Sequence, residues 1–186
     1  SDIQSTPRCN LDIPAMGDVR GLKIALDIDL GFFAVDPDVE KNLRTVAQSL
    51  RDAGAIVEEV SLGWDKSIAE DWYGSWAVFM AAAYENLTDV NIEENAHLLS
   101  DGFAYLVRRG RKISAVTARK WEFRRTQSWL KLSAILEKYD ALLCPTMAIT
   151  APAVEKRDSD YGSLDENGRM LGMDMTGIFN YVAQCP

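Results

Sequence analysis

The sequence has few residues of the kinds that build metal, cofactor or disulfide sites. Its 186 residues include three cysteines and one histidine. The cysteines, Cys9, Cys144 and Cys185, are far apart and form no Cys-x-x-Cys pair. Such spacing argues against a zinc site and against a disulfide framework. We therefore expect free thiols in a reducing compartment, a cytoplasmic location and no cofactor.

Long apolar runs and an excess of positive charge are also lacking. No apolar stretch reaches the roughly 18 residues of a membrane-spanning helix, and no signal-peptide pattern opens the chain. Lysine and arginine number 20 against 28 acidic residues, which gives a formal net charge of -8. An acidic surface repels phosphate backbones. We therefore expect neither a membrane nor nucleic acid as a partner.

One local basic run departs from this acidic character. It consists of Arg108, Arg109, Arg111 and Lys112. A run that binds nucleic acid usually has interleaved aromatic residues on which bases can stack, and this run has none. We interpret it as the solvated end of a helix.

Motifs for nucleophiles, phosphates and metals are missing as well. No serine lies in a Gly-x-Ser-x-Gly elbow, and no phosphate-binding glycine loop follows the first expected strand. Near His97 there is no nucleophile motif, so we interpret it as a surface or packing residue. The aspartates at 27, 29, 36 and 38 lack the spacing of a calcium loop. We expect no metal site.

What the sequence does contain is a strand–helix–strand pattern after a polar lead-in over residues 1–20. Residues 22–28 alternate apolar and polar side chains, as a strand does. Asp36 can cap a helix that begins at Pro37, and Gly54 can end it. A second strand then covers 55–60. This order predicts a right-handed βαβ unit with parallel strands.

The remainder predicts a helical layer and one more strand. Residues 64–99 are rich in helix formers, and Asp101-Gly102 indicates a break between two helices. A further helix is expected over 114–137. One continuous face of this helix is marked by Trp121, Arg125, Ser128, Trp129, Leu132, Ile135 and Leu136. Residues 139–144 predict a brief buried strand. Residues 146–172 form a long loop of a kind that is uncommon without a function. Asp174 can then cap a last helix. We treat 1–186 as one α/β segment.

Three ordered parts of the chain resemble the amidase signature family. The first comprises Gly21–Leu26, Val35–Val39 and Leu50–Val60. The second is Tyr139–Thr146, and the third is Thr176–Asn180. The resemblance implies the fold class, an α/β βαβ unit plus a helical layer within a partial mixed sheet. It also implies amide C–N hydrolysis by a serine nucleophile, a second serine on a cis peptide bond and a lysine base.

Those catalytic residues lie on a Gly/Ser-rich signature and on an upstream lysine, and no such Gly-Gly-Ser-Ser-Gly type run occurs here. No catalytic residue can therefore be assigned. The resemblance implies the C-terminal portion of an amidase whose parent enzyme takes a small-molecule amide. We expect this portion to be inactive alone.

Five residues are candidates for the wall of a substrate pocket. Thr146 and Met147 follow a predicted strand, and residues after such a strand often line pockets in α/β folds. The resemblance places Thr176, Phe179 and Asn180 near the active site. The alternative is that the threonines are turn or cap residues and that Phe179 belongs to the core.

A second hypothesis is a non-enzymatic α/β binding or assembly module, with the aromatic region 64–84 as its interface. A nucleotide-binding protein is disfavoured because the phosphate loop is missing. Strands without their neighbours leave open edges and bare apolar faces. We therefore expect a homo-oligomer, or pairing with the missing catalytic portion.

Overall fold

The computed structural model describes residues 17–87, 91–156 and 163–182, so most of the predicted lead-in lies outside the described residues. The strands are β1 (Lys23–Leu26), β2 (Ile56–Glu59), β3 (Ala141–Leu143), β4 (Ser163–Leu164) and β5 (Met170–Leu171). The helices are α1 (Pro37–Asp52), α2 (Ser67–Leu87), α3 (Ile92–Asn95), the 3-10 helix η1 (Ala96–Leu98), α4 (Asp101–Lys112), α5 (Ala115–Leu136) and α6 (Gly177–Val182).

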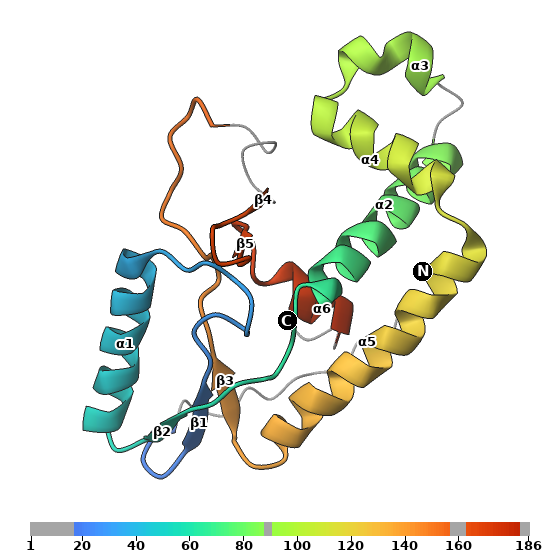
Figure 1. Ribbon diagram of the computed structural model, residues 1–186. Helices are drawn as coiled ribbons and strands as arrows, with labels where there is room; N and C mark the ends of the chain where they lie inside the picture. Colours follow the sequence, from blue (N-terminus) through green and yellow to red (C-terminus); the bar gives the residue numbers. More distant parts are fainter. Residues whose placement is uncertain (1–16, 88–90, 157–162, 183–186) are drawn as a thin grey trace.

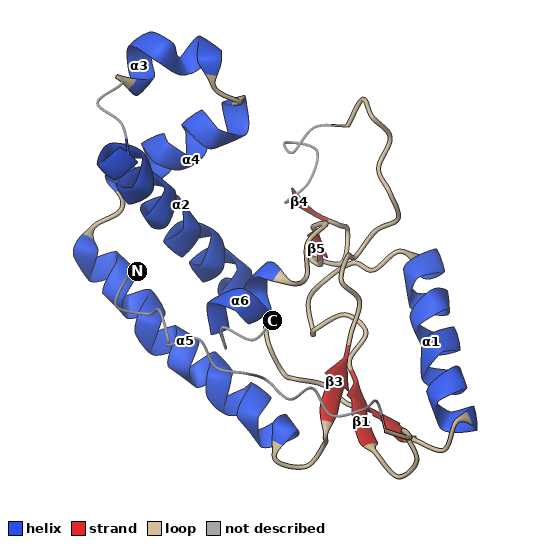
Figure 2. Cartoon of the chain, turned by 180° about the vertical axis from the view of Figure 1, so that it is seen from behind, coloured by secondary structure: helices blue, strands red, loops and turns tan. Residues whose placement is uncertain are grey.

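A parallel sheet with the order β2-β1-β3 forms the base of the fold (Figure 1). Lys23 pairs with Ile56 on one side of β1, and Ile24 pairs with Ala141 on the other. Helix α1 covers one face of the sheet, and α5 runs along the opposite side, as the view from behind also shows (Figure 2). The predicted βαβ unit and α/β class are confirmed.

The two faces of the sheet carry separate cores, since successive side chains of a strand point to opposite faces. On one side, Ile24 and Leu26 pack with Leu43 and Ala47 of α1. On the other side, Leu142 packs against a larger cluster that contains Leu132 of α5. Strand β3 is less buried than predicted, because among the described strands it has a neighbour on one edge only.

Local capping sets the bounds of α1. Asp36 is extended, with ψ 135°, and its carboxylate accepts a hydrogen bond from the Asp38 amide at 2.8 Å. Pro37 is the first helical residue. Gly54, with φ +98°, follows the C-cap residue Ala53. The predicted start and end of this helix are therefore both correct.

The helices beyond β2 form a second lobe. In this lobe α2 and α4 approach closely, because Gly110 places the α4 backbone directly against Ala77 and Ala81 of α2. The break before α4 falls earlier than predicted: Ser100 is the N-cap, so Asp101 opens the helix. Within the described part of the chain, no helix is long and apolar enough to cross a membrane.

Helix α5 joins this lobe to the sheet. Ser114 caps it and Leu132 is its buried residue. A salt bridge fixes it to α2, with the Nε of Arg124 at 2.6 Å from the buried carboxylate of Asp71. Two residues of the predicted face, Trp129 and Leu136, instead point outward and are exposed. The predicted face is one position too wide, because a helix repeat of 3.6 residues carries both side chains past the contact.

The region 146–172 contains more regular structure than its composition predicts. Strands β4 and β5 pair antiparallel, with Leu164 opposite Met170. Met170 also forms a bridge with Phe33, and its amide donates to the Phe32 carbonyl at 2.8 Å. The second half of this predicted loop is therefore attached to the turn that follows β1.

That turn is tight and buried. Leu30 has φ +52° and is fully buried, although non-glycine residues rarely adopt positive φ. Gly31 follows with φ +87°, and a Cβ at this position would lie 2.6 Å from the carbonyl oxygen of Trp64. The turn therefore requires glycine both for its backbone conformation and for its close approach to Trp64.

We expect Gly31→Ala to lower the free energy of unfolding by about 3 kcal/mol, because it adds a steric clash to backbone strain. Gly63→Ala is the matched control, because Gly63 has φ +64° with open space around it. This substitution should lower the free energy of unfolding by about 1 kcal/mol, from backbone strain alone. Urea unfolding of both variants measures the difference. Equal losses would contradict the role assigned to the Trp64 contact.

Candidate functional site

The carboxyl ends of β1 and β3 form the natural place for a site in this sheet. From β1 the chain crosses over α1 to β2 on one side, and later returns to place β3 on the other side. Ligands of open α/β sheets bind in the crevice where the strand order reverses in this way. The segments that follow Leu26 and Leu143 therefore border the candidate site.

Asp27 holds these strand ends together. Its amide donates to the Leu143 carbonyl at 3.0 Å. One carboxylate oxygen accepts from the Leu30 amide at 2.9 Å, and the other accepts from the Leu62 amide at 2.8 Å. Asp27 is only 3% exposed. Burial raises the pKa of its carboxyl group, against the lowering effect of the backbone hydrogen bonds that it accepts.

Cys144 lies at the end of β3 on the same edge. Burial raises the pKa of its thiol to about 11, and the negative charge of Asp27 adds to this effect. A thiolate is the reactive form of cysteine, so the raised pKa favours the less reactive, protonated thiol of Cys144 at neutral pH. The sequence does not predict this protonated thiol, because Cys144 lies in no recognisable motif.

The next residues of the chain pair with a later segment. Met147 and Asp174 form an antiparallel bridge. The Ala148 amide donates to the Met173 carbonyl at 2.8 Å, and the Met175 amide donates to the Thr146 carbonyl at 3.2 Å. These bonds bring two segments, 146–148 and 173–175, side by side.

Asp174 also organises the start of α6, as predicted. Its Oδ1 atom accepts from the Thr176 amide at 2.7 Å, from the Thr176 hydroxyl at 2.6 Å and from the Gly177 amide at 3.2 Å. A carboxylate at a helix N-terminus stabilises the helix, because it accepts hydrogen bonds from unpaired backbone N–H groups and faces the positive end of the helix dipole. The Thr176 hydroxyl is therefore engaged by Asp174.

The five predicted wall residues divide into two kinds. Thr146, Met147, Thr176 and Asn180 are exposed; Thr146 and Met147 belong to the pairing just described, and Thr176 follows the paired segment directly. Phe179 is half-buried and its ring lies 5.2 Å from that of Trp64, within the core that also contains Leu132. Phe179 thus packs against the core, as the alternative interpretation of the sequence has it.

Chemically, this arrangement offers a surface and not a nucleophile. Its polar groups are backbone amides and carbonyls, the hydroxyls of Thr146 and Thr176, the Asp174 carboxylate and the exposed side chain of Asn180. No group of three or more His, Cys, Asp or Glu residues in the described ranges could hold a metal ion. His97 lies in η1, within the lobe at the far end of α2 (Figure 1).

The model of the family described as Amidase matches residues 2–184. The chain belongs to the amidase family. Acylamidase of Rhodococcus erythropolis is 25% identical over 132 residues, which cover 71% of this chain and 27% of the relative. One of the subunits of glutamyl-tRNA(Gln) amidotransferase from Streptococcus sanguinis strain SK36 is 26% identical over 167 residues, which cover 77% of this chain and 33% of the relative.

Solved structures share the fold of this amidase-family chain. A bacterial aryl acylamidase of the amidase signature family matches with a TM-score of 0.74 and 24% identity, over 88% of this chain and 36% of that one. A 6-aminohexanoate cyclic dimer hydrolase matches with a TM-score of 0.60 and 20% identity, at the same coverage. The chain thus spans about a third of the length of these relatives.

We expect Cys144 to contribute a pH-dependent part of the stability. Its ordinary pKa is 9.0 and its folded pKa is about 11, so the folded state retains a proton that the unfolded state loses. This contribution is complete below pH 9 and is lost as the pH rises toward 11. Between pH 8 and pH 10 the unmodified chain should lose about 1 kcal/mol more than Cys144→Ala.

Urea unfolding at the two pH values checks this, and every other titrating group is common to both proteins. The expectation is wrong if the two proteins lose the same stability between pH 8 and pH 10. A rapid reaction of folded Cys144 with a thiol reagent at pH 7.5 would independently contradict its burial.

Proposed function

We propose that this chain is the C-terminal portion of an amidase-family hydrolase that cleaves amide C–N bonds. In this proposal the chain supplies scaffold and part of the substrate pocket, and it is inactive alone. The observation that carries the proposal is the pairing of 146–148 with 173–175 at the carboxyl edge of the sheet. Family membership supports amide hydrolysis as the activity of the whole enzyme.

The site geometry supports a role as pocket wall. Met147 is 38% exposed, although methionine is among the residues most often buried. It lies between Thr146, which is exposed, and Ala148, which is buried and paired through its backbone. An apolar side chain beside hydroxyl and backbone polar groups is typical of small-molecule sites, which are mostly apolar with a few placed polar groups.

The lack of a nucleophile supports inactivity of the chain alone. No Gly/Ser-rich signature occurs in the 186 residues, and burial keeps the thiol of Cys144 protonated by raising its pKa. Hydrolysis of an amide requires an activated nucleophile and donors for the developing oxyanion. The walls of a pocket cannot replace either.

An outward apolar stripe on α5 supports the need for a further protein surface. Val116, Phe123 and Leu130 recur every seven residues and are 67%, 75% and 54% exposed. Residues at this spacing lie on one side of a helix. Large exposed apolar side chains aligned on one side of a helix are candidates for a protein interface. We propose the catalytic portion of the enzyme as the covering surface.

The purified chain is expected to show no turnover of a panel of aliphatic and aromatic amides above the uncatalysed rate. Release of amine is the measurement, with an intact amidase as the positive control. Turnover that co-purifies with the chain through two orthogonal columns, and that survives in independent preparations, would refute the inactive-alone part of the proposal.

A small amide at millimolar concentration is expected to shift the NMR signal of the Met147 methyl group saturably. Met80 on α2, which is half-buried and remote in sequence from the wall, serves as the internal control and should not shift. Met147→Leu assigns the signal. Thr146→Ala should weaken the binding severalfold if its hydroxyl contacts the amide.

An alternative is the non-enzymatic binding module, which one observation favours: Trp76 and Phe79 stack at 5.4 Å on α2 and are 42% and 57% exposed. The same NMR titration separates the two functions. A binding module would show no saturable shift at Met147 for any amide in the panel.

A further inference from the structure

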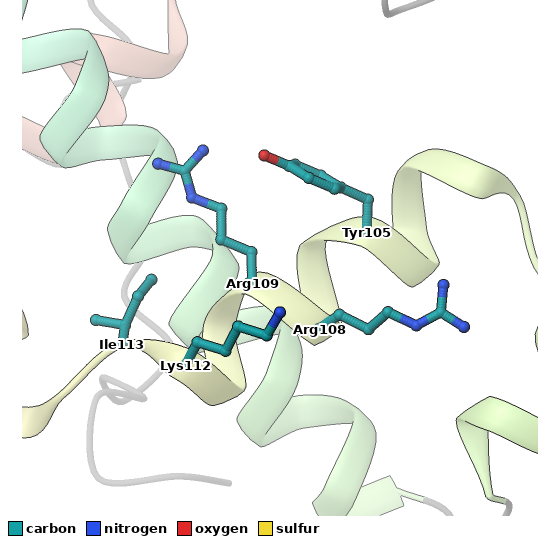
Figure 3. Close-up of a pocket in the computed structure, with 5 residues that line it drawn as sticks. All are labelled: Tyr105, Arg108, Arg109, Lys112 and Ile113. Atoms are coloured by element: carbon teal, nitrogen blue, oxygen red, sulfur yellow. The ribbon is translucent and has the colours of Figure 1, made fainter.

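The basic run on α4 forms a hollow in the second lobe, away from the candidate pocket. Tyr105, Arg108, Arg109, Lys112 and Ile113 line this hollow, which we call the α4 hollow (Figure 3). The sequence predicts a solvated helix end, and Arg109, Arg111 and Lys112 do lie in the last turn of α4. The helical spacing adds an aromatic side chain that the linear run lacks, since Tyr105 precedes Arg109 by one turn.

Two of the four cations in the run are neutralised. An Nη atom of Arg108 lies 2.7 Å from a carboxylate oxygen of Glu93, and the Nε of Arg111 lies 2.8 Å from that of Glu85. In Figure 3, Arg108 points away from the side chains of Tyr105 and Arg109. Arg108 therefore lines the hollow with its stem while its guanidinium, like that of Arg111, is engaged in an ion pair.

The other two cations differ. None of the ion pairs formed by the described residues involves Arg109 or Lys112. The guanidinium of Arg109 lies over the ring of Tyr73, 4.9 Å from its centroid. A contact with a ring face fixes the plane of a guanidinium and leaves the N–H groups at its edge available.

Two donor groups therefore face one space, and a third lies farther along the same helix. The Tyr105 hydroxyl and the Arg109 guanidinium point toward one another, and the Lys112 ammonium lies on the same side of α4 (Figure 3). The carboxyl end of a helix carries about half a negative charge, which opposes an anion. The two positive charges of Arg109 and Lys112 together exceed this half charge. The hollow is therefore locally positive, although the chain has a net charge of -8.

We propose that the α4 hollow binds a compact oxyanion, the carboxylate or phosphate group of a small molecule. Arg109 provides a fork of N–H donors that suits either group. Lys112 adds a point charge and Tyr105 adds a hydroxyl donor. Ile113 provides an apolar edge for the rest of the ligand. The proposal is independent of the amidase function, because it rests on a different lobe.

The test is an NMR titration of the chain with sodium phosphate and, separately, sodium benzoate at constant ionic strength. Saturable shifts of the Tyr105 and Ile113 amides are expected, and they should weaken as salt screens the charges. The variants R109Q and K112Q should each weaken binding about tenfold. K41Q, which removes one exposed lysine of α1, is the matched control and should change the affinity less than about twofold.

The ligand with the tighter binding identifies the source of the oxyanion. Shifts that grow linearly without saturation would overturn the proposal, as would an equal loss in K41Q and K112Q. A single-stranded oligonucleotide that binds more tightly than both small anions through Arg109 and Lys112 would also overturn it, in favour of a nucleic-acid surface. Thermal unfolding of each variant shows whether the fold is retained.

Discussion

The carboxylate of Asp27 is the group on which the sheet edge depends. A buried carboxylate is costly unless its oxygens accept hydrogen bonds, and here each oxygen accepts one backbone amide from a different segment. The amide of the same residue donates to Leu143, the last residue of β3. One residue therefore aligns the ends of all three parallel strands. The positions of Cys144 and of the 146–148 wall follow from that alignment, because both come directly after β3.

Features determined by neighbouring residues could be predicted from the sequence. Asp36 and Pro37 define the start of α1, Ser114 precedes the start of α5, and Asp174 precedes α6, because capping bonds join residues two or three positions apart. The family was also predictable, since its ordered segments coincide with β1, α1 and β2. Of the candidate wall, Thr146 and Met147 were predicted from their place after a strand and Thr176 from the resemblance, while the pairing of 146–148 with 173–175 was not predicted.

Features that depend on distant residues could not be predicted. Asp27 resembles any other polar residue of an alternating strand until Leu62, 35 positions away, donates to it. The pairing of β4 with β5 depends on Phe32 and Phe33, far upstream. The outward position of Trp129 depends on which side of α5 meets Leu142 and the cluster around it. Amphipathic spacing alone gives the width of a face and not its direction.

The pairing of 146–148 with 173–175 also has an evolutionary consequence. It closes the base of the intervening stretch, so the ends of that stretch are fixed to each other by backbone bonds. The entropy of closing such a segment grows only with the logarithm of its length. Insertions, deletions or exchanges between Ala148 and β4 would therefore alter the border of the candidate pocket at little cost to the sheet, whereas β5 is bonded to Phe32, Phe33 and Ala34. A family that diversifies its substrates could change this stretch while it keeps the same scaffold.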